Sequence, residues 1–271
     1  MQVSLQIRNM AEVQHLADKL SRGELKKALS LALNDTGYTV QKAMRTALAG
    51  AFDRPTTYIT KSPWVKLAKP GELSVSVAPT YMGGKGIDPQ KVLQVQEFGG
   101  RRKDKRFEVA LRRVGILPRG YVTATPKVPY PGSDDGHGNL KGSFVVQLLS
   151  YFQAFGEQGY KANMSAKGYL RVHRGTKKQT GRRYFVTYGK TRGGPRITQK
   201  GEQDERTAHL SPGIWAASGT GGALVRPVLL FVRPKRGYQP RFDMDKVAKR
   251  ADATAYLERR IRYRLREAAG V

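Results

Sequence analysis

The feature that most constrains the fold is a helical pattern from about residue 10 to residue 52. Apolar and small residues recur there at three-to-four spacing, which places them on one stripe of a helix. Residues 34–37 (NDTG) are of the types that kink or split a helix. The high alanine content permits close helix packing, within the chain or between subunits. The stripe comprises Leu25, Ala28, Leu29, Ala32, Thr36, Val40, Ala43 and Ala47, and the outward set comprises Lys26, Lys27, Gln41, Lys42 and Arg45.

A second amphipathic pattern, over about residues 243–268, predicts a helix at the other end of the chain. Its apolar side consists of Met244, Val247, Ala248, Ala251, Ala255 and Leu265, and arginines crowd its far end. Both terminal helices are suited to subunit contacts. We expect oligomer packing at Ala28, Ala32, Ala43, Ala47, Met244, Val247 and Ala251.

Shorter elements fill the region between these helices. Asp88 and Pro89 are typical of a helix cap and first turn, and Phe144, Leu148, Tyr151, Phe152 and Phe155 form the inward side of another helix. Alternation and turn residues predict strands at 58–67, 73–78, 121–125, 169–173, 184–188, 213–217 and 225–232, and helices at 88–98, 107–114 and 139–155.

These elements predict an α+β fold, with long N- and C-terminal helices packed on a mainly antiparallel sheet and a basic β-hairpin insertion. We expect a single domain over residues 1–271. The strands at 169–173 and 184–188 form the hairpin, with its tip at 175–181, inside a basic arm over residues 158–207.

The charge balance points to the class of partner. Lysine and arginine number 49 against 21 acidic residues, a formal net charge of +28, so the chain needs salt, an acidic partner or nucleic acid nearby. Cysteine is absent, which excludes disulfides and thiolate chemistry. The first eight residues lack a signal-peptide pattern and residues 225–232 are too short to span a bilayer. We therefore expect no membrane association.

No pattern in the sequence indicates catalysis. The four histidines are far apart, and the glycine clusters at 83–86 and 218–222 match no phosphate-binding motif. Residues 133–139 (SDDGHGN) combine carboxylates with a histidine, but they lack the ligand spacing of a calcium loop and are more typical of an Asx-type turn before a helix cap. We expect no enzymatic activity, no metal site and no cofactor.

The stretch 160–199 carries many cations and no acidic residue, with Tyr169, Tyr184, Phe185 and Tyr188 set among them. Cations neutralise phosphates and rings stack on bases, so the pattern fits nucleic-acid contact. It fits equally a β-hairpin with a solvated basic edge. We expect contact with nucleic acid or an acidic partner at Lys167, Arg171, Arg174, Lys177, Lys178, Arg182, Arg183, Lys190, Arg192, Arg259, Arg260, Arg262, Arg264 and Arg266.

Several stretches resemble phage tail-completion or neck proteins of the prophage minor tail protein Z type. They are residues 28–36 (ALSLALNDT), 52–56 (FDRPT), 93–102 (LQVQEFGGRR), 105–108 (KRFE) and 226–229 (RPVL), followed by the terminal helix. Residues 130–210 make this chain longer than that type, so the role of this region is not implied by the resemblance.

The resemblance implies a virion protein without catalytic residues, made in the host cytoplasm and placed in the tail or the head–tail neck. Its expected partners are the portal, neck or tail components, further copies of itself in a homo-oligomeric ring, and packaged DNA in non-specific contact. An alternative is a non-specific nucleic-acid-binding protein of phage DNA packaging or processing. A nuclease, the third reading, requires a carboxylate cluster that the sequence does not indicate.

Overall fold

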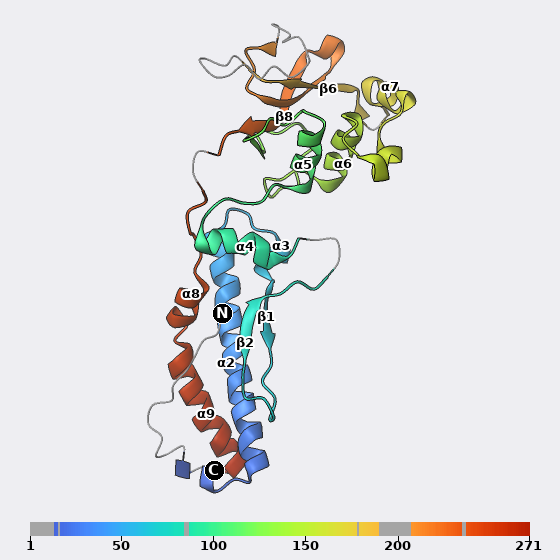
Figure 1. Cartoon of the computed structure of the whole chain (residues 1–271). Coiled ribbons are helices and arrows are strands. Elements are labelled where there is room, and N and C mark those ends of the chain that lie inside the picture. The colour runs from blue at the N-terminus through green and yellow to red at the C-terminus, as the bar shows by residue number, and fades with distance from the viewer. Residues whose placement is uncertain (1–13, 16, 84–86, 178, 190–206, 235–236) are drawn as a thin grey trace. The chain divides into compact units, whose positions relative to one another are not determined.

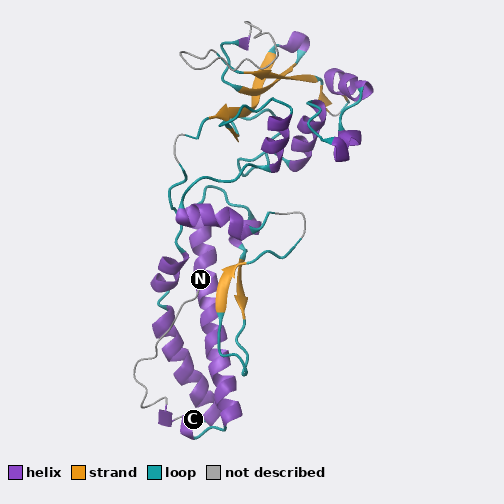
Figure 2. Ribbon diagram, in the orientation of Figure 1, coloured by secondary structure: helices purple, strands orange, loops and turns teal. Residues whose placement is uncertain are grey.

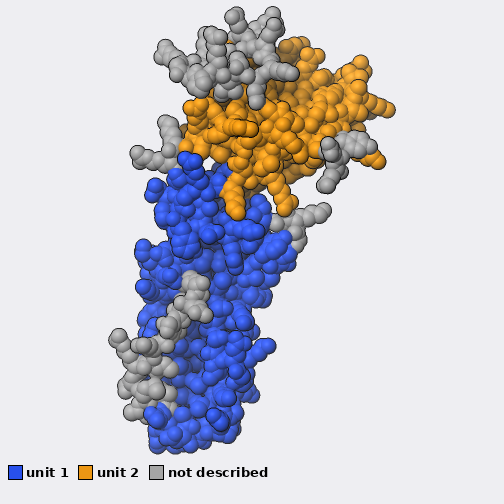
Figure 3. Space-filling model, in the orientation of Figure 1, with its two compact units in different colours: residues 1–102, 237–271 blue, residues 103–236 orange. Residues whose placement is uncertain are grey.

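The computed structural model describes residues 14–15, 17–83, 87–177, 179–189, 207–234 and 237–271. The chain divides into two compact units, residues 1–102 with 237–271 (unit 1) and residues 103–236 (unit 2), as Figure 3 shows. Each unit has hydrophobic clusters of its own. The fold therefore differs from the single domain expected over residues 1–271: unit 1 is built from both ends of the chain and unit 2 is inserted between them.

Unit 1 is organised around helix α2 (Arg22–Ala51), which lies beside α8 (Met244–Arg250) and α9 (Ala253–Ala269) (Figure 1). A capping box between Ser21 and Glu24 begins α2. The two long helices are antiparallel, because the first turns of α2 pack on the end of α9. One cluster contains Ala28, Ala32, Leu257, Ile261 and Leu265, and the other contains Val40, Met44, Leu48, Leu93, Phe242, Met244, Ala248 and Ala253.

Helix α2 continues without a break through residues 34–37, because each of these residues has a partner there. The Asn34 side chain exchanges hydrogen bonds with the backbone of Ala68, and the Thr36 hydroxyl donates to the Ala32 carbonyl at 2.9 Å. At Gly37 a Cβ would lie 2.7 Å from Val75 Cγ2 and 2.8 Å from Val65 Cγ1. Residue types that usually weaken a helix therefore serve packing here.

The face of α2 at Gly37 carries a two-stranded antiparallel sheet, β1 (Pro63–Lys66) with β2 (Ser76–Pro79). Gln41 is buried and donates to the Pro63 carbonyl at 2.8 Å, and Arg45 donates to the same oxygen at 3.3 Å. The expectation that Gln41 and Arg45 face solvent is therefore wrong. The strand expected at 58–67 is also wrong at its start, where α3 (Thr57–Thr60) precedes Pro63.

The chain leaves and re-enters unit 1 beside the end of helix α4 (Pro89–Phe98), whose Asp88 cap and Pro89 start are confirmed. The Gly100 N–H donates to the Tyr238 carbonyl at 3.1 Å, and the Tyr238 N–H donates back at 2.6 Å. Gly99 has φ +76°, and a Cβ there would lie 2.8 Å from the Tyr238 oxygen. Only glycine fits this position without strain.

Unit 2 contains a four-stranded antiparallel sheet in the order β3–β8–β7–β6, shown with the separate β1–β2 pair in Figure 2. A register shift between Ile214 and Trp215 lies where Pro227, which has no N–H, meets β7. The main cluster of unit 2 packs this sheet against the helices and includes Leu111, Phe144, Leu148 and Ile214. The elements are β3 (Val122–Ala124), β6 (Arg182–Thr187), β7 (Gly213–Ser218), β8 (Leu224–Val232), α5 (Arg106–Arg113), α6 (Gly142–Tyr151), α7 (Ala166–Arg174), β4 (Gly175–Thr176), β5 (Gln179–Thr180), η1 (Glu157–Ala162) and η3 (Thr220–Gly222).

The α+β class is confirmed, with three differences in the elements. The strand expected at 169–173 is helix α7, and among the described residues of that arm the two-residue strands β4 and β5 form the hairpin. The terminal helix expected as one piece is broken at Asp252, whose φ of 48° lies in the left-handed region that aspartate tolerates. The long terminal helices pack on each other and on β1–β2, whereas the four-stranded sheet belongs to unit 2.

Asp35 provides a test of how the chain ends are joined. Its carboxylate accepts hydrogen bonds from Arg260 and Arg264, and all three side chains are three-quarters buried or more. We expect Asp35→Ala to lower the free energy of unfolding of unit 1 by about 1–3 kcal/mol, because two largely buried guanidinium groups lose the acceptor that they share.

The matched control is Asp53→Ala, which removes an aspartate whose side chain is 86% exposed beside Arg54. Denaturant unfolding followed by circular dichroism measures both variants. A loss no larger in Asp35→Ala than in Asp53→Ala contradicts a structural role for this ion pair.

Candidate nucleic-acid or acidic-partner interface

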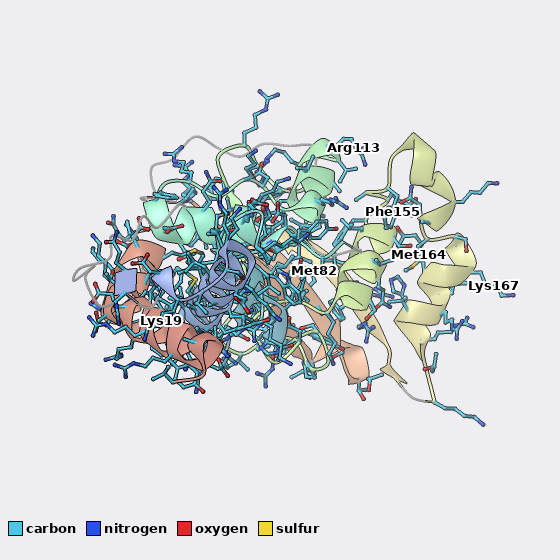
Figure 4. All side chains as sticks on the ribbon, turned by 90° about the horizontal axis from the view of Figure 1, so that it is seen from below. Lys19, Met82, Arg113, Phe155, Met164 and Lys167 are labelled. Atoms are coloured by element: carbon cyan, nitrogen blue, oxygen red, sulfur yellow. The ribbon has the colours of Figure 1, made fainter. Side chains whose placement is uncertain are left out.

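Helix α7 carries cations on one side only. Ser165 begins the helix, its hydroxyl accepting from the Gly168 N–H at 3.3 Å, and Gly175 ends it with φ +81°. Lys167, Arg171 and Arg174 are exposed, and Figure 4 shows Lys167 projecting away from the ribbon. The structure thus brings three of the predicted contact residues onto one helix.

The opposite side of α7 is anchored to helix α6 through Tyr151. The Tyr151 hydroxyl lies 3.0 Å from His173 Nε2, and the Tyr169 hydroxyl donates to the Tyr151 carbonyl. The Tyr151 ring lies 4.8 Å from the Tyr169 ring and 5.9 Å from the His173 ring, centroid to centroid. Burial raises the pKa of the Tyr151 hydroxyl, which keeps it a hydrogen-bond donor at neutral pH.

The end of α7 also lies tightly against the start of β6. A Cβ on Gly181 would lie 2.2 Å from the His173 carbonyl oxygen and 2.8 Å from the Arg174 carbonyl carbon, so only glycine permits this approach. Two further predicted contact residues, Lys177 beyond the helix and Arg183 on β6, are exposed. The sequence signal that identifies α7 as a helix is a serine cap ten residues before a glycine, and these two residues flank the stretch 169–173 that was expected to be a hairpin strand.

Arg182 is a correction to the predicted contact set, because it is buried. Its guanidinium lies 5.6–5.7 Å from the ring centroids of Tyr130, Phe144 and Tyr184, and it donates to Gln147 Oε1 at 2.8 Å. Burial raises the pKa of Tyr184 to about 12, so this ring stays neutral beside the cation. Arg182 therefore belongs to the core of unit 2 and is not available to a phosphate.

Two arginines of the terminal helix are likewise engaged inside unit 1. Arg260 donates to Asp35 Oδ2 at 2.6 and 2.9 Å, and Arg264 donates to Asp35 at 3.0 and 3.3 Å. The pKa of Arg264 is raised, first by its hydrogen bond to Glu267 and then by Asp35. Arg262 is half-buried, whereas Arg259 and Arg266 are exposed.

The remaining predicted contacts, Lys178, Lys190 and Arg192, lie outside the described residues. The residues expected to pack subunits together have positions inside unit 1. Ala28 and Ala32 are buried against α9, and Met244 is buried against α2, with Ala47 and Val247 packed beside that cluster. Their small or apolar side chains serve contacts within one chain, and Ala43 and Ala251 are half-buried.

The loop at 133–139 forms the Asx-type turn that its residues indicate. Asp135 Oδ1 accepts from the N–H groups of His137 at 2.8 Å and Asn139 at 3.0 Å. Burial opposes ionisation of Asp135, but these N–H donors lower its pKa on balance. Helix α6 begins later than expected, with Lys141 at its cap.

Two features escaped the sequence reasoning. Glu108 is fully buried and accepts from the Thr123 N–H at 2.8 Å, the Thr123 hydroxyl at 2.7 Å and the Lys105 N–H at 2.7 Å, thereby joining α5 to β3. Glu108 lies three residues after the cap residue Lys105, which is the position of a capping-box glutamate, and nothing else in the sequence indicates its burial. Unit 1 also exposes large apolar side chains, of which Trp64 and Tyr38 are each 52% exposed.

Within the described part of the chain, no three histidine or acidic side chains come close enough to hold a metal ion. None of the described helices has the length and apolar content that a membrane span requires. Comparison with protein-family models, curated proteins and solved structures gives no match for the chain.

Adjacent arginines on β6 test the division between buried and exposed cations. We expect Arg182→Ala to destabilise unit 2 by about 2–4 kcal/mol, because it removes a desolvated cation from three rings and leaves a cavity. Arg183→Ala is expected to change stability by no more than about 0.5 kcal/mol. Thermal or denaturant unfolding of the two variants checks this, and equal losses would rule out the buried position of Arg182.

Proposed function

We propose that the protein is a structural virion subunit of a bacteriophage tail or head–tail neck, which completes or joins the tail as part of an oligomeric ring. The resemblance of residues 28–36, 52–56 and 93–102 to tail-completion proteins supports the phage setting. The observation that carries an assembly role is the set of large apolar side chains on the surface of unit 1.

Several of these side chains belong to α2 and to the hairpin that lies on it. Pro63 and Val65 of β1 are buried, so the intervening Trp64 faces away from α2 and is 52% exposed. Leu31 and Tyr38 are seven residues apart on α2, and Asn34, on the same stripe between them, bonds the end of the hairpin at Ala68. Leu31 and Tyr38 therefore lie on the stripe of α2 that meets the end of the hairpin, and Trp64 lies on the outer face of the hairpin. Exposed apolar surface of this kind is typical of protein–protein contact sites.

The net charge of +28 sets a condition on such an assembly. Subunits that each carry this charge repel one another. At physiological ionic strength, salt screens this repulsion over a distance of about 8 Å. Apolar contacts therefore compete with repulsion unless DNA or an acidic protein neutralises the surface. A virion neck or tail, where portal, tail proteins and packaged DNA meet, provides these partners.

The second candidate is a non-specific nucleic-acid-binding protein of phage DNA packaging or processing. The exposed cations of α7 favour it, since they suit phosphate contact without any virion partner. The two functions differ in assembly. The first requires association through the apolar surface and incorporation into particles, and the second requires only DNA complexes.

The apolar surface of unit 1 is tested by replacing Trp64 and Tyr38 together with serine. We expect the wild-type protein to form a discrete oligomer at moderate salt, and the double variant to shift to monomer with an unchanged circular dichroism spectrum. Surface truncations of this kind change folding stability little. Light scattering across a concentration and salt series measures the mass.

The matched control is Val146→Ser on α6 of unit 2, where the side chain is 54% exposed. The control should retain the wild-type mass and the ability to complete tail-deficient particles in vitro. Wild-type protein that neither associates nor enters such particles would overturn the proposed function.

A further inference from the structure

We propose that helix α7, with Lys177 and Arg183 beside it, is the DNA-binding face of unit 2 and contacts the phosphate backbone of duplex DNA. This inference deepens the proposed function and rests on it for the source of the DNA. It assigns the ligand class that the sequence leaves open between nucleic acid and an acidic protein.

The cations of α7 form a regular row. Lys167, Arg171 and Arg174 occupy positions i, i+4 and i+7, which lie on one stripe of a helix. The row is roughly 10 Å long at 1.5 Å per residue. Duplex DNA presents a negative charge about every 1.7 Å along its axis, so a row of this length meets several phosphates.

Within the described part of the chain these cations have no acidic partner. None of Lys167, Arg171, Arg174, Lys177 and Arg183 forms an ion pair there, and the sequence from 160 to 199 contains no acidic residue. Arg260 and Arg264, by contrast, already share Asp35. The α7 cations are thus left for an external anion.

Ordinary helix energetics do not account for the row. Arg171 and Arg174 lie in the last turn of α7, where cations favour the helix dipole. Lys167 lies in the first turn, where a positive charge is unfavourable, and Lys177 and Arg183 lie outside the helix. An anion along the row offsets the unfavourable position of Lys167.

The aromatic residues set among the cations decide between duplex and single-stranded DNA. Single-strand binding requires rings that stack on bases. Tyr184 is 5% exposed in the core, the Tyr169 ring packs on Tyr151, and Tyr188 packs 6.3 Å from Phe231. Three of the four rings are thus engaged within unit 2, and the fourth, Phe185, is half-buried on β6. The cations are the larger exposed set, which favours contact with the backbone of an intact duplex.

The anchored side of α7 makes the row rigid before binding. The Tyr151–His173 hydrogen bond, the Tyr169 contact and the close approach of Gly181 fix the helix on α6 and β6. A preformed helix saves the entropy that ordering a flexible arm requires on binding. A flexible basic arm would lack this advantage.

The test compares two neutralised triple variants of the full-length chain. The first is Lys167→Gln/Arg171→Gln/Arg174→Gln, and the control is Lys26→Gln/Lys27→Gln/Lys42→Gln, which removes the same charge from exposed positions on α2 of unit 1. Fluorescence anisotropy with labelled 20-base-pair duplexes of unrelated sequences, and with a single strand of equal length, measures affinity across a salt series.

We expect the α7 variant to lose at least tenfold in duplex affinity and up to about 0.9 in salt slope per phosphate contact removed. The control should stay within about threefold of wild type, and duplex affinity should not depend on sequence. Circular dichroism and thermal unfolding establish that both variants remain folded.

Equal losses in the two triple variants, or an unchanged α7 variant, overturn the inference, because binding would then follow net charge alone. Wild-type protein that binds poly-glutamate but no duplex also overturns it in favour of an acidic protein. The oligomer mass of the α7 variant separates the two proposals. If the α7 variant forms the wild-type oligomer but does not bind duplex DNA, the result supports both the assembly role and the DNA-binding face. If the wild-type protein binds duplex DNA through α7 but never associates, the result supports only the DNA-binding face.

Discussion

The ion pair of Asp35 with Arg260 and Arg264 joins helices that are more than two hundred residues apart in the chain, and the architecture of unit 1 depends on that meeting. Apolar contacts alone allow antiparallel helices to slide by a turn, whereas two guanidinium groups one turn apart around a single carboxylate fix the register. Unit 1 therefore forms only when both ends of the chain are present. Unit 2 must lie between them, and the chain passes between the units at Gly100 and Tyr238, where paired backbone hydrogen bonds hold its two crossings together.

The arginines of this protein show how local surroundings divide one residue type between two roles. Arg182 is surrounded by three rings and Arg260 is bound to a carboxylate, and each is costly to desolvate without these partners. Arg171, Arg174 and Arg183 stay in solvent. A count of cations therefore overstates the charge available to a partner, and the useful quantity is the set that no internal ring or acid already satisfies.

The spacing of apolar residues predicted the helices and strands that bury a single regular face. The helical stripe of α2, the Asp88–Pro89 start of α4, and strands β7 and β8 all follow this rule, whereas the continuity of α2 through residues 34–37 was not predicted. The same reasoning wrongly predicted a strand in the α7 segment. Tyr169 and His173 have the i, i+4 spacing of one helix face, but the neighbouring cations are also typical of a strand edge. The division into two units was not visible either, since it depends on Asp35 meeting Arg260 across the whole chain length.

The sequence predicted most of the residues of the candidate site, but it did not predict which of their side chains are exposed. Lys167, Arg171, Arg174, Lys177 and Arg183 were identified from an acid-free stretch. The burial of the adjacent Arg182 was not predictable, because alternation sends neighbouring side chains of β6 to opposite faces without indicating which face is buried. Of the alanines expected between subunits, Ala28 and Ala32 pack on α9 and Ala47 packs on the cluster that contains Met244 and Ala248, all within unit 1.

The two proposed contact surfaces belong to different units, and this has a consequence for assembly. The side chains suited to protein contact, Trp64 and Tyr38, belong to unit 1, while the unpaired row of α7 belongs to unit 2. In the proposed assembly, phosphate bound at α7 lowers the net positive charge of each subunit. Since like charges oppose association, neutralisation at unit 2 strengthens contacts made at unit 1. Binding at the two surfaces is then coupled through electrostatics, with no conformational change required, and the coupling weakens as salt rises.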